Sequence, residues 1–137
     1  MSAVTFDHAG LSVADLDGAQ AFYGAAFGFA PEFAFTLGDD GTRGVMLRHP
    51  SGMRLELFER PGASAGLQGA MPLDAIGTRG FGHVAFATAE LDAAHDAAVA
   101  AGAASRVPPG PSPEPGVRFA FLADPEGNLV ELVGRGA

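Results

Sequence analysis

Apolar and polar positions alternate in short runs bounded by turn formers along most of the chain, a pattern that predicts β-strands. The expected strands lie at 4–13, 30–37, 42–48 and 53–59 in the first half and at 80–88, 104–107, 117–123 and 128–134 in the second. Between them, two segments carry apolar residues at helical spacing, so we expect helices over 16–27 and about 91–101. Asp15 is suited to cap the first helix and Gly28 to end it. Each half is therefore predicted to run strand, helix, three strands.

The two halves of the chain repeat the same landmarks at a constant spacing. The segment HAGLSVADLD at 8–17 corresponds to HVAFATAELD at 83–92. In the same way, HPSGMRLEL at 49–57 corresponds to DPEGNLVEL at 124–132. Both pairs are offset by 75 residues, so the halves align with no net insertion between these landmarks. Such self-similarity indicates a duplicated structural unit.

The repeat predicts an α+β fold of two tandem βαβββ modules. We place the first module at about 4–59 and the second at about 80–134, within one domain spanning 1–137. The glycine-rich segment 60–79 is expected to connect the modules. The proline-rich segment 107–116 is expected either to connect two strands or to form a semi-rigid wall beside a ligand.

Composition limits the classes of function. The 137 residues are 47% hydrophobic and 18% charged, which disfavours disorder, and no apolar run approaches the roughly 18 residues of a membrane span. The net charge is -8, and the eight basic residues are scattered arginines, so neither nucleic acid nor a membrane is an expected partner. There is no cysteine and the start of the sequence has no secretory pattern, so we expect a cytoplasmic protein.

Two histidines and two glutamates occupy duplicated positions in the predicted strands. Because side chains alternate between the faces of a strand, His8, Glu56, His83 and Glu131 should project from equivalent faces, opposite the apolar stripes. Taken singly, each could be a structural histidine or an edge glutamate. A glutamate among apolar neighbours is nevertheless costly to bury unless it is paired or binds a metal. Together the four predict one divalent ion, such as nickel, zinc, iron, cobalt or manganese, with two positions open to a substrate.

The same strand faces carry candidate substrate contacts. Phe6, Phe58 and Phe81 lie at even spacing from the histidines and glutamates and are expected to contact a small-molecule substrate. Arg54, two residues from Glu56, could bind an anionic group of the substrate. A solvated arginine, or one paired with a carboxylate of the protein, is the alternative.

Several motifs resemble the vicinal oxygen chelate superfamily, which includes glyoxalase, bleomycin-resistance proteins, extradiol dioxygenases and methylmalonyl-CoA epimerase. The motifs that carry the resemblance are VADL at 13–16, AFY at 21–23, FGF at 27–29, GFGHVAF at 80–86 and FLADPEGNLVEL at 121–132. The resemblance implies that the two modules form an open, curved mixed sheet around a metal site. It also implies that the metal ligands are His8, Glu56, His83 and Glu131.

The identity of the ligands distinguishes members of the superfamily. Glu56 follows the glyoxalase pattern, since epimerases typically carry glutamine there. Extradiol dioxygenases use two histidines and one carboxylate, assisted by a further histidine and a tyrosine. Here Tyr23 lies on the core stripe of the first helix, His95 on the second helix and His49 in a turn, which weakens that alternative. Metal-free binding proteins of this fold generally lack a complete ligand set.

Resemblance to glyoxalase implies a metal-dependent lyase or isomerase that moves a proton next to a carbonyl. Glu131 is the expected base, with Glu56 the symmetric alternative. No convincing arginine and asparagine set for glutathione can be identified, so glutathione stays open as a co-substrate and another hydroxycarbonyl is an alternative. An epimerase, a dioxygenase and a metal-free binding protein remain alternatives, and the resemblance also implies a homodimer.

Overall fold

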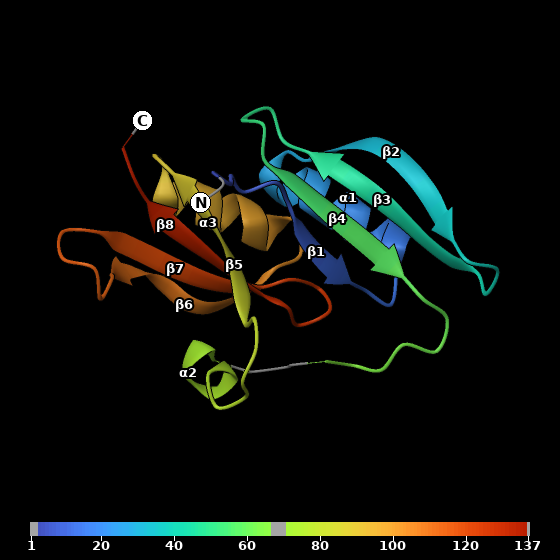
Figure 1. The fold of residues 1–137 in the computed structure, drawn as a ribbon. Helices are drawn as coiled ribbons and strands as arrows, with labels where there is room; N and C mark the ends of the chain where they lie inside the picture. Colours follow the sequence, from blue (N-terminus) through green and yellow to red (C-terminus); the bar gives the residue numbers. More distant parts are fainter. Residues whose placement is uncertain (1–2, 67–70, 137) are drawn as a thin grey trace. The chain divides into compact units, whose positions relative to one another are not determined.

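The computed structural model describes residues 3–66 and 71–136, which form two compact units with the same topology (Figure 1). The first unit, Met1–Ala63, contains β1 (Ala9–Ser12), α1 (Leu16–Phe27), β2 (Ala30–Leu37), β3 (Thr42–Arg48) and β4 (Arg54–Glu59). The second unit, Ser64–Ala137, contains α2 (Pro72–Ala75), β5 (His83–Thr88), α3 (Leu91–Ala100), β6 (Ala104–Pro111), β7 (Arg118–Ala123) and β8 (Leu129–Gly134).

Each unit builds one open, four-stranded mixed sheet. The strand orders are β1-β4-β3-β2 and β5-β8-β7-β6, so the first and last strands of each module are neighbours. These neighbours run parallel, whereas the remaining pairs are antiparallel. The predicted α+β fold of two βαβββ modules is therefore confirmed. None of the described helices has the length and apolar character needed to cross a membrane.

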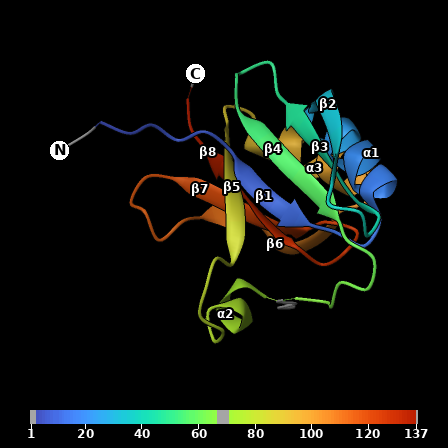
Figure 2. The same ribbon diagram turned by 45° about the vertical axis from the view of Figure 1, so that its right-hand side comes forward.

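One face of each sheet packs against the helix of its own module (Figures 1 and 2). In the first unit alternate buried residues of β3 and β4 form the face that meets the buried stripe of α1: Val45, Leu47, Leu55, Leu57, Leu16, Ala19, Phe22 and Tyr23. In the second unit the corresponding set is Phe86, Leu91, Ala98, Ala120, Leu122, Val130 and Leu132. Burial of these stripes provides the main driving force for folding of each unit.

The strands that carry the histidines are shorter than their sequence patterns suggest. The expected strand 4–13 is confined to Ala9–Ser12, and the expected strand 80–88 begins at His83. In both cases the parallel neighbour begins level with this point, because β4 starts at Arg54 and β8 starts at Leu129. An apolar segment without a hydrogen-bonding neighbour does not extend the sheet.

The connecting segments contain more regular structure than predicted. The first part of 107–116 is not a loop, because β6 continues to Pro111. Its prolines are tolerated because β6 is the outer strand of its sheet, and its pairing is irregular on both sides of Val107. Within 60–79 the short helix α2 was not predicted, while residues 67–70 lie outside the described part of the chain.

The two module helices begin differently. At α1 the Asp15 side chain accepts from the Gly18 N–H, as predicted, and the Glu59 carboxylate accepts from the Leu16 N–H at 2.8 Å. Arg43 donates to the same carboxylate at 3.1 Å. At α3 the cap residue makes no side-chain cap hydrogen bond, and Gly134 stands 75 residues after Glu59. The first module therefore ties its helix to its last strand through a carboxylate that the second module lacks.

We predict that Glu59→Gln lowers the thermal denaturation midpoint at neutral pH by a few degrees. The midpoint of the variant should also change less with pH in the acidic range. The hydrogen bond from Leu16 and the Arg43 guanidinium lower the pKa of Glu59 below its ordinary value of 4.5. The ionised carboxylate therefore stabilises the fold above that value, and the stabilisation is lost as the pH falls through the lowered pKa. Thermal denaturation across acidic pH measures the effect. Asp39→Asn, in an exposed turn, is the charge-matched control, and equal curves for both variants would contradict the prediction.

Candidate metal centre

In the first module, a histidine and a glutamate that are far apart in sequence lie side by side. His8 immediately precedes β1, and Glu56 lies on β4, where it is the parallel partner of Gly10. His8 Nε2 is 3.1 Å from Glu56 Oε1. On the other side of the ring, His8 Nδ1 is 2.6 Å from Asp7 Oδ2. The imidazole is therefore held between two carboxylates.

The second module repeats the pair in the same register. His83 begins β5, and Glu131 on β8 is the parallel partner of Ala85, as Glu56 is of Gly10. His83 Nε2 is 3.2 Å from Glu131 Oε1. The His83 ring also meets Phe121 edge to face, with the ring centroids 5.0 Å apart. The structure thus brings each predicted histidine together with the glutamate of its own module.

The protonation of His8 follows from its two neighbours. A nitrogen 2.6 Å from a carboxylate oxygen must carry a proton, and the second contact with Glu56 also favours the charged ring. These contacts raise the pKa of His8 above its ordinary value of 6.5, with the Asp7 hydrogen bond as the largest cause and Glu56 the next favourable one. Without a metal ion, a proton on Nε2 allows the close approach of Glu56.

The separation of donor atoms in each pair fits two adjacent ligands of one metal ion. Two donors about 2.1 Å from an ion and at right angles to each other are roughly 3.0 Å apart. The observed distances are 3.1 Å and 3.2 Å. Within residues 3–66 and 71–136, no group of three or more metal-binding side chains is found. Each module therefore supplies half of the expected ligand set.

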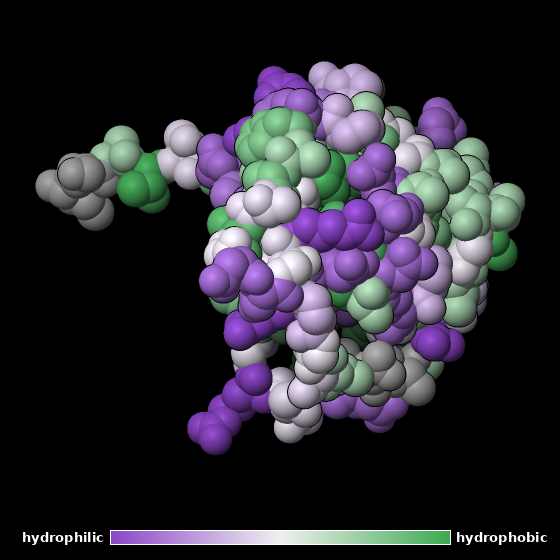
Figure 3. Space-filling model, turned by 90° about the vertical axis from the view of Figure 1, so that its right-hand side faces the viewer, coloured by the Kyte–Doolittle hydropathy of each residue, from purple (hydrophilic) through white to green (hydrophobic). Residues whose placement is uncertain are grey.

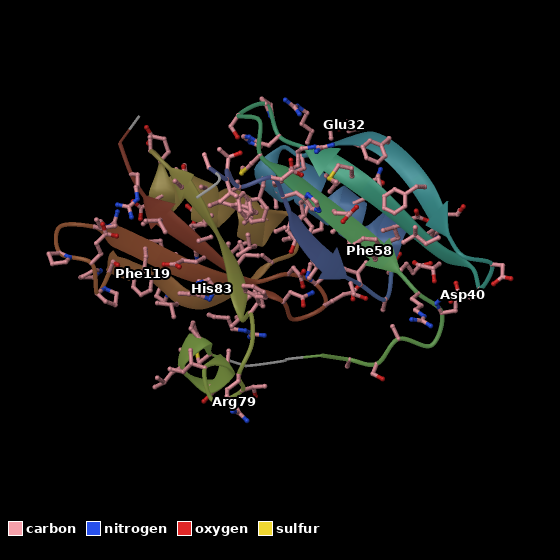
Figure 4. All side chains as sticks on the ribbon, viewed as in Figure 1. Glu32, Asp40, Phe58, Arg79, His83 and Phe119 are labelled. Atoms are coloured by element: carbon pink, nitrogen blue, oxygen red, sulfur yellow. The ribbon has the colours of Figure 1, made fainter. Side chains whose placement is uncertain are left out.

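Arg54 is already paired with carboxylates. Its guanidinium is 2.6 Å from Glu32 and 3.6 Å from Asp7, and it lies 6.0 Å from the centroid of the Phe33 ring. Of the alternatives considered for Arg54, pairing within the protein is the one observed. Glu32 was not predicted, because an acidic residue on an outer strand carries no signal that distinguishes it from surface charge. It is labelled at the start of β2 in Figure 4.

Of the three phenylalanines predicted to contact a substrate, one lies on a strand and two lie in exposed segments before the strands. Phe58 lies on β4 and meets the Phe35 ring edge to face at 5.8 Å (Figure 4). Phe6 and Phe81 stand before the strands and are 81% and 107% exposed. Seen from the right-hand side of Figure 1, hydrophilic and hydrophobic side chains are interspersed (Figure 3).

The second module places apolar side chains around its histidine and glutamate. Phe121 is the antiparallel partner of Glu131, and it forms a cluster with Leu129, Ala75 of α2, Val107 and Phe119. His83 and Phe119 are labelled in Figure 4. Sequence reasoning missed the two phenylalanines, although the spacing of Phe119 and Phe121 by two residues on a strand could have indicated a shared face.

The remaining candidates for metal or redox chemistry have structural roles. Tyr23 is only 1% exposed in the α1 core, where it packs against Phe22 with ring centroids 5.1 Å apart. His49 is 2.8 Å from the Ser51 hydroxyl in its turn, and His95 on α3 is 2.8 Å from the Ser105 hydroxyl. None of the three joins a described histidine–glutamate pair.

Solved structures from several organisms share this fold. Glyoxalase I from Zea mays is 24% identical with a TM-score of 0.76 over 95% of this chain, which spans 44% of the maize chain. A glyoxylase/bleomycin resistance protein/dioxygenase domain from Frankia sp. EAN1pec is 22% identical with a TM-score of 0.77, covering 96% of this chain and 92% of that one. The trypanothione-dependent glyoxalase I of Leishmania major is 21% identical with a TM-score of 0.70, covering 96% and 86%. At these identities the likeness shows the fold.

Sequence comparison identifies the family directly. No curated protein sequence matches the chain significantly. A sequence model of the Glyoxalase/Bleomycin resistance protein/Dioxygenase superfamily matches residues 5–132, which include both histidine–glutamate pairs and nearly all of both modules. The chain therefore belongs to the glyoxalase/bleomycin resistance protein/dioxygenase superfamily.

Proposed function

We propose that the protein is a metal-dependent lyase or isomerase of the glyoxalase type, acting on a small substrate with oxygens on adjacent carbons. The observation that carries this proposal is the duplicated histidine–glutamate pair, with donor atoms 3.1 Å and 3.2 Å apart in the two modules. The same spacing at both positions suits shared ligation better than two unrelated surface contacts.

The proposed metal ligands are His8, Glu56, His83 and Glu131. Two imidazoles and two carboxylates suit a divalent ion such as nickel, zinc, iron, cobalt or manganese. One chain, or two copies in a homodimer, would bring a pair from each module together. When bound, the ion would act as a Lewis acid toward the carbonyl group of the substrate.

Glu131 is the proposed base of the reaction. Its carboxylate would take the proton from the hydroxyl-bearing carbon next to the substrate carbonyl, breaking the C–H bond and forming an O–H bond, and then return that proton to the former carbonyl carbon. The hydroxyl hydrogen of the first carbon would move to the former carbonyl oxygen, so that the carbonyl and the hydroxyl exchange places. Phe121 and Leu129 border Glu131 with apolar surface, which limits the access of water to the exchanging proton. Glu56 is the symmetric alternative, and its surroundings include the Asp7 and Arg54 charges.

The placement of Tyr23 favours this function over cleavage of an aromatic ring. Tyr23 is the only tyrosine in the sequence, and its ring is in the core of the first unit. The other two histidines are hydrogen-bonded to serines away from the pairs. Within its own unit, neither pair therefore has a tyrosine or a further histidine beside it to assist a dioxygenase reaction.

We predict that the protein binds a divalent ion and that His8→Ala or Glu131→Ala abolishes stoichiometric binding. Removing one of four ligands lowers affinity and opens the ion to exchange with water. Elemental analysis after loading with nickel, zinc or iron measures the occupancy. His49→Ala and His95→Ala are matched controls, because they remove imidazoles outside the pairs. Full occupancy in both ligand variants would refute the assignment of the site.

We predict that Glu131→Gln lowers kcat by roughly 10²–10⁴-fold, the usual contribution of a general base, while leaving measurable metal bound. The assay follows conversion of the hemithioacetal of methylglyoxal and glutathione by the metal-loaded protein, and other hydroxycarbonyls test whether glutathione is required. Glu90→Gln, an exposed isosteric change at the start of α3, should retain full activity. If Glu56→Gln abolishes turnover and Glu131→Gln does not, Glu56 is the base. Metal binding without turnover of any hydroxycarbonyl would contradict the lyase or isomerase assignment.

We predict that metal affinity rises with pH until His8 is fully deprotonated. In the metal-free protein the raised pKa of His8 stabilises the fold below 6.5, and this stabilisation is lost as the pH rises through the raised value. A metal ion must displace the Nε2 proton, so binding releases that proton and strengthens as protons become scarce. Titration calorimetry with nickel in buffers of different ionisation enthalpy measures the released protons. Binding without proton release would contradict the prediction.

A further inference from the structure

We propose that Asp7 is a positioning residue that holds the proton of His8 on Nδ1, so that Nε2 of His8 is free for a metal ion. The metal-free modules then hold opposite histidine tautomers, and the first module is the one prepared for binding. This inference rests on the proposed function, since it assigns a role within the same site.

The two contacts of His8 differ in length. Asp7 Oδ2 is 2.6 Å from Nδ1, whereas Glu56 Oε1 is 3.1 Å from Nε2. When the ring is neutral it carries a single proton, and the shorter contact with a carboxylate retains it. Nε2 then presents its lone pair on the side of Glu56, as a metal ligand must. Hydrogen bonds of this kind orient histidine ligands in metal sites generally.

Asp7 is itself held by charged neighbours. The side chain of Asp7 is 73% exposed, so its position depends on its partners. Arg54 on β4 lies 3.6 Å from Asp7 and is fixed on its other side by Glu32 at 2.6 Å. Ring contact with Phe33 on β2 restrains the same guanidinium. The sheet thus orients Asp7 through Arg54, and Asp7 orients His8.

The second module lacks each member of this chain of contacts. At the positions that the strand register makes equivalent, Gly82 stands in place of Asp7, Leu129 in place of Arg54 and Arg106 in place of Glu32. His83 Nδ1 makes no hydrogen bond within residues 3–66 and 71–136, and the ring lies against Phe121. In a neutral His83 the negative charge of Glu131, whose Oε1 lies 3.2 Å from Nε2, therefore favours a proton on Nε2 over one on Nδ1.

The difference has a consequence for the order of binding. Once its ring has become neutral, His8 offers an ion the required lone pair on Nε2, whereas a neutral His83 must first move its proton to Nδ1. The first module is therefore expected to anchor the ion. Glu131 lies in the second module, whose histidine has fewer polar partners than His8. A carboxylate held by fewer contacts suits the proposed role of Glu131 in exchanging a proton.

The first test is the tautomer of each histidine in the metal-free full chain, measured by nitrogen-15 NMR at a pH where the rings are neutral. We expect the Nδ1–H form for His8 and the Nε2–H form for His83. In Asp7→Asn, His8 should change to the Nε2–H form and donate to Glu56. Asp96→Asn is the matched control, because Asp96 also lies beside a histidine, with Oδ1 3.5 Å from His95 Nδ1, outside the proposed ligands. An Nε2–H form of His8 in the unmodified protein would overturn the proposal.

The second test is nickel affinity of the same variants by titration calorimetry. Asp7→Asn should weaken binding by about 10–100-fold, as is usual when the hydrogen-bonding partner of a ligand is removed. Asp96→Asn should change the nickel affinity by less than about 3-fold, because an exposed charge pair usually contributes little free energy. Equal affinities for the two variants would overturn the proposed role of Asp7. If the unmodified protein binds no nickel, zinc or iron, the proposed function fails, and the tautomers of the metal-free protein alone decide the assignment of Asp7.

Discussion

In each module the first strand pairs in parallel with the last, and the rest of the module depends on this pairing. Parallel neighbours need a long connection, which here contains the helix and two further strands. The connection brings together residues 48 positions apart, so that His8 meets Glu56 and His83 meets Glu131. Because a shift by one residue would turn every side chain to the opposite face, the apolar stripe that packs on the helix also fixes the position of each glutamate.

The helix of each module packs on one face of the sheet, so the histidine–glutamate pair lies on the other face. α1 and α3 cover the faces that carry the alternating apolar residues, and the histidine–glutamate pairs project from the opposite faces. The two modules share this arrangement, but the side chains around their histidine–glutamate pairs differ in polarity. The first surrounds its pair with the charges of Asp7, Arg54 and Glu32, whereas the second surrounds its pair with phenylalanine and leucine. The two modules share the register of their parallel strand pair and differ in the side chains around the histidine–glutamate pair.

The repeat made most of the fold predictable from sequence. The bounds of α1, its Asp15 cap and its end at Gly28 were predicted correctly, because capping depends on local residue types. The pairing of each histidine with a glutamate could also be anticipated, since constant spacing implies equal register. The ends of β1 and β5 were wrong, because the length of a strand depends on where its neighbour begins. The partner of Arg54 was missed for a similar reason: Glu32 lies on another strand, and only the folded sheet shows which surface charges meet.

The proline-rich strand β6 bears on how the protein behaves in solution. β6 forms the outer edge of its sheet, where unpaired backbone groups would otherwise offer a template to a strand from another molecule. Proline has no backbone N–H, and successive residues of a strand point their N–H groups to opposite sides, so of the neighbours Pro108 and Pro109 one leaves this outer edge without a donor. In a chain that is 47% hydrophobic, such an edge protects against aggregation. Prolines that first suggest a loop therefore keep an exposed strand from adding to its neighbours in a concentrated protein solution.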